Sequence, residues 1–481
     1  MFITVKPTNP SEKITFAVSE FKIVDQIAVE KECQHPFLDK LFNRVGNCDT
    51  ILRGNGLLFS NEELPLLCTE ETYMMQKMSN YFSFKTDSND SEIDLLKKII
   101  NLTIEDYPFY HEKKLDKQII KNKFREFCLT HSDSMSIQDF SSSLSSFIRN
   151  EFMDTHFFVD PPKSMGTTTV SGPIRLYEIA GKILVAAVLD TLYRNIPLGA
   201  EVISINKIPV NTIIDSLSVS QLGQPERKRM RAVATMLQRN IVDSIQIMFN
   251  TRGKTDSAII RYNNKINIPP QFKPAHCLFE YADSIAYFDI KQMDSYVFLR
   301  FINHIEQIKN AKGLIIDLRG NPGGSSSEGE KLFSLFINRP TVYNHVVSLN
   351  RPNKLESRMI RPNKVIHFPS NYPVVILGDE NTACASEDFI QAMKQLPQCY
   401  FISYSTTCGA LQARYGISFP SGTFLSLDCL SPKTYTHDVG VVENVGISPN
   451  VWVQPTKVED LAPYDDLLKK VSKKIIMSKF Y

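Results

Sequence analysis

The 481-residue sequence lacks several features that would place it in other classes of protein. Its apolar runs, such as Lys182–Leu189, are far too short to span a membrane, and residues 1–7 lack the basic-then-apolar order of a secretory signal. Its 54 basic and 52 acidic residues nearly balance, so no overall field favours nucleic acid or an anionic membrane. We therefore expect a globular protein of two to four domains, without a membrane span or a nucleic-acid partner.

The number and spacing of the cysteines argue against a disulfide framework and against a metal site. Nine are present, an odd number, and they form no Cys-x-x-Cys pair. This pattern argues against a disulfide framework and favours a reducing compartment, so we expect a cytoplasmic protein. Metal-ligand spacing is absent as well, and neither a metal nor a cofactor is expected. The basic cluster Arg227–Arg231 is interpreted as the solvated face of a helix rather than as a binding patch.

The N-terminal third of the chain changes character near residue 91. Residues 1–90 mix short β-rich runs, such as Ile14–Val18, with polar stretches such as Asp87–Ser91, which predicts an α+β domain of unknown role. Residues 92–153 have helical periodicity, including a helix over 134–148. Two apolar stripes and one N-cap support these helices: Ile93, Leu95, Leu96, Ile99 and Ile100; Ile119, Ile120, Phe124 and Phe127; and Ser136.

Residues 166–266 are predicted to be rich in β-strands, with one or two helices. Within them, Ile196–Val210 has a glycine turn, a strand and an asparagine before a second turn, which resembles a PDZ-like module. Such modules bind peptide ends by adding a strand to a sheet edge. The usual carboxylate-binding Gly-Leu-Gly-Phe loop is not evident, so the module either captures a peptide or only braces the rest of the chain.

The chain is organised around Asn381–Phe389, where a buried strand is predicted to turn into a helix. The preceding run Pro373–Leu377 is apolar and β-rich, and the following run Asp388–Lys394 has helical spacing. Cys384 would therefore meet the unpaired N–H groups of the first helical turn, which favour an anion. We expect its thiol to ionise more easily than a free one; the alternative is a buried cysteine that only fills space.

A second segment of interest, Lys312–Gly324, predicts a buried strand that runs into a glycine-rich turn, followed by a helix over Glu328–Ile337. Such a turn leaves backbone N–H groups uncovered and lets another backbone come close. Nucleotide-binding loops share this weak signal, but no Lys-Ser/Thr pair follows, which excludes them. Nearby, Ile285–Ile290 and Tyr400–Tyr404 are predicted strands and Phe298–Ile308 a predicted helix.

Three strings resemble the C-terminal processing (tail-specific) protease family, which includes the tricorn protease core. Asp317–Gly324 carries the string Asp-Leu-Arg-x-Asn-Pro-Gly-Gly. Thr382–Glu387 is similar to Thr-Ala-Ser-x-x-Glu, but Cys384 replaces the serine that attacks the peptide bond. Gly446–Val451 is similar to the closing string Gly-Ile-x-Pro-Asp-Ile, with Asn450 where aspartate is usual. The resemblance covers roughly residues 92–455.

The resemblance also implies partners for the nucleophile. Tricorn-like relatives carry Asp-x-His at the start of a strand, with the histidine as general base, and His156 matches it. A glutamate shortly before the closing string supports their site, and Glu443 matches it. The branch with a lysine base has Gly-Lys-Gly after the next strand. No lysine occurs between Lys394 and Lys433, so a Ser-Lys dyad is not expected.

The resemblance thus predicts a peptidase that hydrolyses peptide bonds in a peptide or protein substrate, with no metal in its site. The implied roles are Cys384 as nucleophile, His156 as base and acid, Glu443 as the group that orients or charge-balances them, and the N–H groups of Ala385 and of Gly323 or Gly324 as oxyanion donors. Ser386 is a rival nucleophile. The alternative function is a catalytically inactive protease-like protein that binds peptide or lipid; relatives such as the interphotoreceptor retinoid-binding proteins keep this fold and bind lipids without proteolysis.

The expected fold class is α/β, with a crotonase-like ββα core, a helical N-terminal segment and a PDZ-like β-rich module. A homo-oligomer is left open. The expected domains are residues 1–90, an α+β domain; 91–165, a helical segment that ends in the His156 strand; 166–266, the PDZ-like module; 267–460, the protease core; and 461–481, a C-terminal helical tail.

Overall fold

The computed structural model describes most of the chain beyond residue 90. The predicted domain of residues 1–90 and its loop near Asp87 lie outside the described residues, apart from two short strands. The described residues are 2–6, 15–19, 91–131, 135–162, 169–170, 172–219, 221, 223–240, 244–262, 277–347, 354–412, 415–427, 433–464 and 466–478.

Contacts within the chain divide it into two units, and each is described by itself. The five predicted domains stay a prediction. The first unit comprises Met1–Met165, Val346–Glu356 and Gln412–Thr434; the second comprises Gly166–His345, Ser357–Leu411 and Tyr435–Tyr481.

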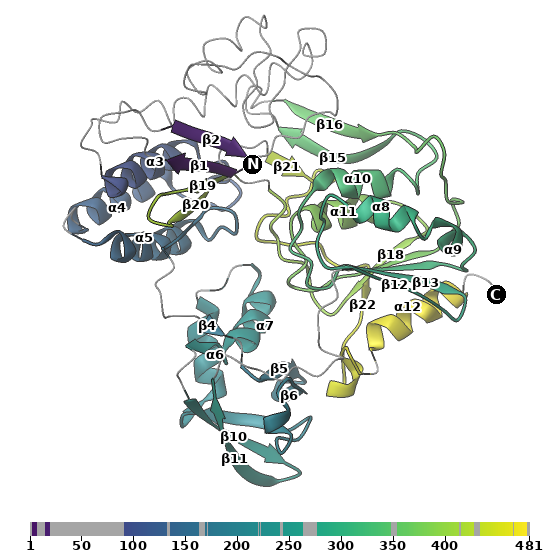
Figure 1. The fold of residues 1–481 in the computed structure, drawn as a ribbon, viewed down its shortest axis with the longest axis horizontal. Helices are drawn as coiled ribbons and strands as arrows, with labels where there is room; N and C mark the ends of the chain where they lie inside the picture. The colour runs from purple at the N-terminus through teal and green to yellow at the C-terminus, as the bar shows by residue number, and fades with distance from the viewer. Residues whose placement is uncertain are drawn as a thin grey trace, which may run out of the picture. The chain divides into compact units, whose positions relative to one another are not determined.

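The first unit contains the predicted helical segment (Figure 1). The Ser136 hydroxyl accepts the N–H of Asp139 at 3.1 Å, which confirms the predicted N-cap. Most of both stripes is buried, but Ile119 is 54% exposed and its assignment to the second stripe is wrong. The helices are α3 (Glu92–Asp106), α4 (Lys117–Thr130) and α5 (Ile137–Phe152).

These helices share one hydrophobic core with a five-stranded sheet. Ile417 and Leu425 of the sheet belong to the same buried cluster as Phe140 and Phe152 of α5. The strand order is β2-β1-β19-β20-β3, with β1 and β19 parallel and the other neighbours antiparallel. The strands are β1 (Phe2–Lys6), β2 (Thr15–Ser19), β3 (Phe158–Asp160), β19 (Tyr415–Ser418) and β20 (Phe424–Leu427).

The second unit begins with a β-rich module that includes two α-helices, as predicted for residues 166–266. Its sheet has the order β11-β10-β7-β6-β5, and β8 pairs with β7 across a turn at Asn206 and Lys207. Its elements are β4 (Thr169–Val170), β5 (Ile174–Ile179), β6 (Lys182–Val188), the 3-10 helix Thr191–Tyr193, β7 (Glu201–Ile205), β8 (Ile208–Pro209), α6 (Val210–Val219), α7 (Pro225–Thr235), β9 (Arg239–Asn240), β10 (Ser244–Thr251) and β11 (Lys254–Arg261).

The rest of the second unit is built on a six-stranded sheet of order β12-β13-β14-β17-β18-β22. β12 is antiparallel to β13, and all the following neighbours are parallel. Its elements are β12 (Cys277–Ala282), β13 (Ile285–Ile290), α8 (Val297–Ile302), α9 (Ile305–Lys309), β14 (Leu314–Asp317), α10 (Ser326–Phe333), β17 (Val374–Leu377), α11 (Ala385–Lys394), β18 (Cys399–Ser403), β22 (Val451–Trp452), the 3-10 helix Val458–Asp460 and α12 (Leu467–Ser478). A three-stranded sheet of order β16-β15-β21 contains β15 (Thr341–Val347), β16 (Leu355–Ile360) and β21 (Lys433–Tyr435). Residues 346–347, 355–356 and 433–434 of these strands are assigned to the first unit.

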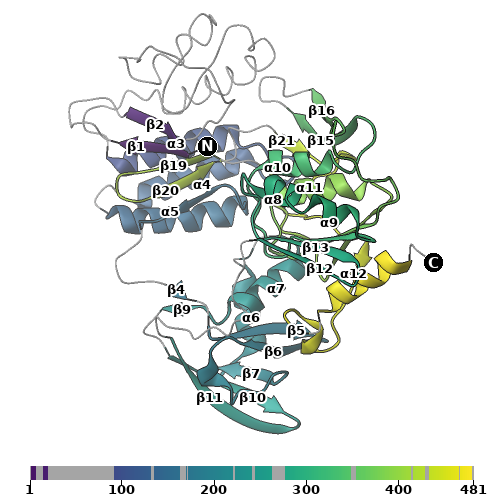
Figure 2. The same ribbon diagram turned by 45° about the vertical axis from the view of Figure 1, so that its right-hand side comes forward.

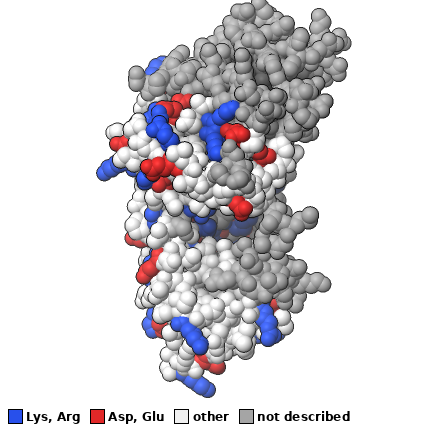
Figure 3. Space-filling model, turned by 90° about the vertical axis from the view of Figure 1, so that its left-hand side faces the viewer, with Lys and Arg blue, Asp and Glu red and all other residues white. Residues whose placement is uncertain are grey.

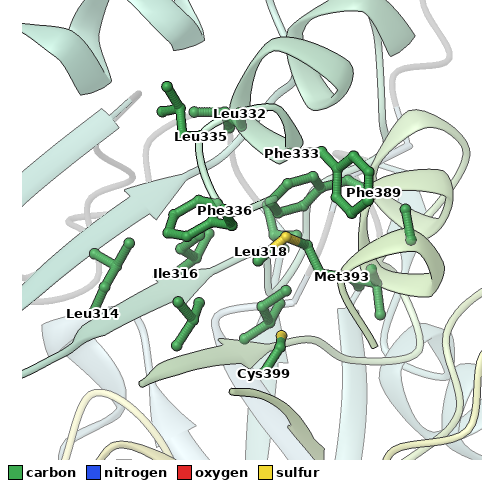
Figure 4. Packing of buried hydrophobic residues seen from close by; sticks show 14 of the residues in the cluster. Leu314, Ile316, Leu318, Leu332, Phe333, Leu335, Phe336, Phe389, Met393 and Cys399 are labelled. Carbon is green, nitrogen blue, oxygen red and sulfur yellow. The ribbon is translucent and has the colours of Figure 1, made fainter. Parts of the chain in front are cut away.

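Both faces of this six-stranded sheet are covered, because successive residues of a strand point to opposite sides. In β14, Leu314 and Ile316 pack with Phe333 of α10 and Phe389 of α11 (Figure 4). Ile315 points the other way, into a cluster that contains Leu468 and Ile476 of α12. Figures 1 and 2 show α10 and α11 on one side of the sheet and α12 on the other. The C-terminal helix therefore forms part of the core packing.

Two predicted helices have other bounds in the structure. The helix expected over Phe298–Ile308 is two short helices, because the chain bends at Asn303 and His304. The helix expected over Glu328–Ile337 begins earlier and ends at Phe333; a tighter turn follows it, in which the N–H of Leu335 bonds to the carbonyl of Leu332 at 3.1 Å. Buried apolar residues continue past Phe333, so burial alone did not mark the end of this helix.

The described surface carries charges of both signs. On the face shown in Figure 3, basic and acidic side chains are interspersed, and neither gathers into a broad field. Among the described residues, no helix combines the length and apolar character that crossing a membrane requires.

Candidate active site

Cys384 lies where the chain leaves β17 and enters α11. Its backbone has φ 55° and ψ −124°, a conformation that costs a non-glycine residue of order 1–3 kcal/mol. The neighbouring N–H of Ala383 donates to the carbonyl of Asn321 at 2.9 Å, which joins this corner to the turn after β14. β14 and β17 are parallel neighbours, so their carboxyl ends meet at one edge of the sheet.

The thiol of Cys384 is half-buried and has backbone N–H groups as neighbours. Burial raises its pKa to about 11; the N–H of Ala385 acts in the opposite direction, the Glu387 carboxylate adds to the rise, and the N–H of Gly324 again lowers the pKa. The expectation that this thiol ionises more easily than a free one is therefore wrong for this structure. The loss of hydration on burial raises the pKa of the thiol by more than the nearby N–H groups lower it.

The two glycines after β14 have different parts in this corner. Gly323 has φ 97° and lies so close that a Cβ added to it would be 2.6 Å from the Cβ of Cys384. Its N–H is already bonded to the side-chain oxygen of Asn321 at 2.8 Å. Gly324 has φ 141°, and its N–H acts on the sulfur of Cys384. Of the two glycines predicted as alternative donors, Gly324 is the one whose N–H faces the thiol.

Glu387 holds the start of α11 to the loop that follows β18. Its fully buried carboxylate accepts the N–H groups of Cys384 at 3.0 Å, Gly409 at 2.7 Å and Ala410 at 2.8 Å, and the hydroxyl of Thr407 at 2.5 Å. Burial raises the pKa of Glu387, and these bonds lower it. The sequence motif included Glu387, but nothing in it indicated the three loop residues that donate to it.

Glu443 lies on a loop bonded to the loop that Glu387 holds. The N–H of Asn444 donates to the carbonyl of Gly409 at 2.9 Å. The Glu443 side chain is buried near Cys408: burial is the main cause that raises the pKa of Cys408 to about 12, and the charge of Glu443 contributes. Glu443 and Cys384 thus belong to one unit, on adjoining loops.

His156 belongs to the first unit, so the structure does not bring it together with Cys384, and their pairing stays a prediction. It is buried just before β3. Asp154 accepts the backbone N–H groups of His156 at 2.8 Å and Phe157 at 3.0 Å. Burial acts to raise the pKa of Asp154, but Lys113, 2.6 Å away, and further hydrogen bonds keep it below its usual value. In the Asp-x-His string, the aspartate therefore fixes the backbone that carries the histidine.

Ser386, the rival nucleophile, has a fully buried side chain. Its hydroxyl has no hydrogen-bond partner within the part of the chain that the structure describes. Because neither a base nor open space adjoins it there, the geometry disfavours attack by Ser386 on a substrate.

Within the basic cluster Arg227–Arg231 on α7, the interpretation as a solvated face is wrong for Arg227. Arg227 is only 7% exposed. Its Nε donates to the carbonyl of Glu380 at 2.9 Å, and its Nη2 donates to the sulfur of Cys408 at 2.8 Å. Arg231 donates to the side-chain oxygen of Asn381. Two arginines of the β-rich module therefore bind loops that flank Cys384.

A further buried carboxyl, Asp388, lies one residue beyond Glu387. It accepts both amide contacts of Asn344, at 2.9 and 3.0 Å, and one from Gln391 at 3.0 Å. Burial raises the pKa of Asp388 to about 7, although these hydrogen bonds lower it. Across the described residues, no group of three or more His, Cys, Asp or Glu is arranged to hold a metal ion.

The comparisons with known proteins agree on the class of this core. Residues 284–453 match the model of Peptidase family S41. A 157-residue stretch is 25% identical to the carboxy-terminal processing protease CtpB of Bacillus subtilis, covering 33% of this chain and 31% of that protein. A 148-residue stretch is 30% identical to a probable CtpA-like serine protease of Staphylococcus epidermidis, covering 31% and 29%. These matches support a peptidase core, and they span less than a third of each relative.

Solved structures extend the likeness to the fold of a larger part of the chain. Mature CPAF, solved in complex with lactacystin, matches with a TM-score of 0.58 and 15% sequence identity over 80% of this chain and 97% of that chain. Mature CPAF alone gives the same score over 80% and 96%. At this identity the likeness concerns the mixed α/β fold alone. The crotonase-like core and the PDZ-like module stay predictions.

Proposed function

We propose that this protein is a peptidase in which Cys384 attacks the peptide bond, with His156 as the base that takes the thiol proton and returns it to the leaving amine. The N–H groups of Ala385 and Gly324 stabilise the oxyanion, and Glu443 orients or charge-balances the site. The substrate is a peptide or protein. A thiolate nucleophile is readily oxidised, and the proposal therefore keeps the cytoplasmic location expected from the cysteines.

One observation carries this proposal: two backbone N–H groups, from different segments, act on the same sulfur. Amide hydrolysis places negative charge beside the nucleophile, and fixed donors at that position are the largest single contribution in many such sites. The strained backbone of Cys384 and the positive φ of both glycines hold this arrangement. A cysteine that only filled space would not need a strained corner lined with donors.

The pKa of about 11 defines what the base must do. Near neutral pH the isolated thiol is almost entirely protonated, so attack needs a base that removes the proton. An imidazolium beside the thiolate would also lower the pKa of the thiol. The proposal therefore depends on His156 reaching Cys384 in the working enzyme.

The test is a comparison of peptides released from a proteome digest by wild type, Cys384→Ala, His156→Ala and Ser386→Ala. We expect Cys384→Ala and His156→Ala to lose cleavage to background, and Ser386→Ala to retain it. Loss of cleavage in Ser386→Ala with retention in Cys384→Ala would reject the assignment. A wild type that cleaves nothing but retains peptide or lipid would favour the non-enzymatic alternative.

A further inference from the structure

Helix α7 contacts the loops around Cys384 through side chains that the proposed chemistry does not use. Arg227 spans two of these loops, with one donor on the carbonyl of Glu380 and another on the sulfur of Cys408. Arg231 binds the side chain of Asn381, and Gln224, at the N-terminus of α7, donates to the carbonyl of Asn444 at 3.0 Å. The helix therefore contacts the loop that precedes Cys384 and two loops that follow it in the sequence, at Cys408 and at Asn444.

The loop that precedes Cys384 is held from its other side by the turn after β14. The Asp379 carboxylate accepts the N–H of Gly320 at 3.0 Å and the N–H of Asn381 at 2.9 Å. The Thr382 hydroxyl donates to the carbonyl of Leu318 at 2.8 Å. The loop thus lies between the glycine turn, which belongs to the same sheet, and α7, which belongs to the β-rich module.

We propose that Arg227 and Arg231 are positioning residues that fix the loop before Cys384, so that its sulfur stays aligned with the N–H groups of Ala385 and Gly324. A guanidinium suits this task because its fixed fork donates in two directions at once. The β-rich module then acts as a brace for the active site through α7. This inference rests on the proposed function only for its kinetic consequences.

The same helix offers a matched control. Arg229 lies between the two positioning arginines, but it binds groups of its own module: Glu178 of β5 at 2.6 Å and Asn211 of α6 at 3.2 Å. Arg229→Met therefore removes a guanidinium from α7 without releasing a loop beside Cys384. Arg227→Met and Arg231→Met remove the donors and keep a long apolar side chain.

The first measurement is hydrogen exchange of the full chain, followed by mass spectrometry. We expect peptides covering residues 379–384 to exchange about tenfold faster in Arg227→Met and Arg231→Met than in wild type, because a tertiary restraint on local opening is lost. Peptides covering β14 should not change, and Arg229→Met should resemble wild type. Equal exchange over 379–384 in all four proteins would overturn the proposal, whether or not the protein is a peptidase.

The second measurement is kinetic. A misplaced nucleophile lowers kcat by roughly tenfold to a hundredfold, whereas binding of the substrate is retained. We therefore expect Arg227→Met to lower kcat with KM within about twofold of wild type. Arg227→Lys should recover only part of kcat, since lysine lacks the fork. Thermal unfolding shows whether each variant folds. If Arg227→Met does not fold, the kinetics of Arg231→Met, which removes a single contact with the loop, test the proposal. Full kcat in a folded Arg231→Met, or an equal loss in Arg229→Met, would overturn the proposal.

Discussion

Cys384 and Cys408 are two thiols of one unit, and burial raises the pKa of both, to about 11 and about 12. Their neighbours differ. Cys384 is half-buried at a strained corner and faces backbone N–H groups, whereas Cys408 is buried and receives a guanidinium donor from Arg227. The comparison teaches that the pKa alone does not distinguish a reactive cysteine from a structural one. The direction and origin of the hydrogen-bond donors do.

The largest effect on the difference between these two cysteines is expected from a variant that moves the backbone at Cys384. Gly323→Ala would place a Cβ against that of Cys384 and force alanine into φ 97°. We expect peptide cleavage to fall at least about a hundredfold, because the oxyanion donors lose alignment. Gly320→Ala is the control: it has φ 72° but open space around the added Cβ, so only backbone strain of about 1–3 kcal/mol is expected. Equal activity of the two variants would contradict the role of the turn.

The sheet that supports this corner was predictable from local pattern. The buried strands β13, β14, β17 and β18 correspond to apolar, β-rich runs, because a strand covered on both faces has few polar residues. The corner at Cys384 was predictable as well, since a strand pattern changes there to a helical one. In these segments the local sequence and the tertiary structure agree.

Other features depend on contacts that no local pattern encodes. The bend at Asn303 has no proline or glycine to mark it. Arg227 has the sequence context of a surface residue, and its burial follows only from the docking of α7 on loops more than 150 positions away. The pKa of Cys384 was predicted in the wrong direction, because the helix N-terminus is visible in the sequence and the extent of burial is not.

A smaller effect is expected in the pH dependence of thiol labelling, which compares the pKa of Cys384 with that of Cys408. Labelling by iodoacetamide follows the thiolate, so the midpoint of its pH profile reports the pKa. Without a base nearby, Cys384 should show a midpoint of about 11. If His156 pairs with it, the wild-type midpoint lies lower, and His156→Ala moves it up to about 11. We expect this shift at Cys384 and none at Cys408. An identical midpoint in both proteins would contradict the pairing.

The smallest expected effect concerns stability rather than the thiol. Burial raises the pKa of Asp388 to about 7, so between about pH 4 and pH 7 the unfolded chain has released a proton that the folded chain retains. Wild type should therefore lose stability as the pH rises through this window, and no further from this group above it. In Asp388→Asn that contribution disappears. Urea unfolding of both proteins at pH 4, 5.5 and 7.5 measures the difference.

A constant difference in unfolding free energy across that range would contradict the assignment for Asp388. Arg229→Met, at a half-exposed site far along the sequence, provides a control whose difference should not follow the same profile.

The buried carboxylate of Glu387 has a consequence for motion. It receives four donors from the start of α11 and from the loop at Thr407–Ala410, and each bond would have to break for these segments to separate. A buried carboxylate that loses its donors is energetically unfavourable, so we expect the start of α11 and this loop to move together. An opening that admits a substrate to Cys384 would then form at the edges of this pair of segments, and not between the start of α11 and the loop at Thr407–Ala410.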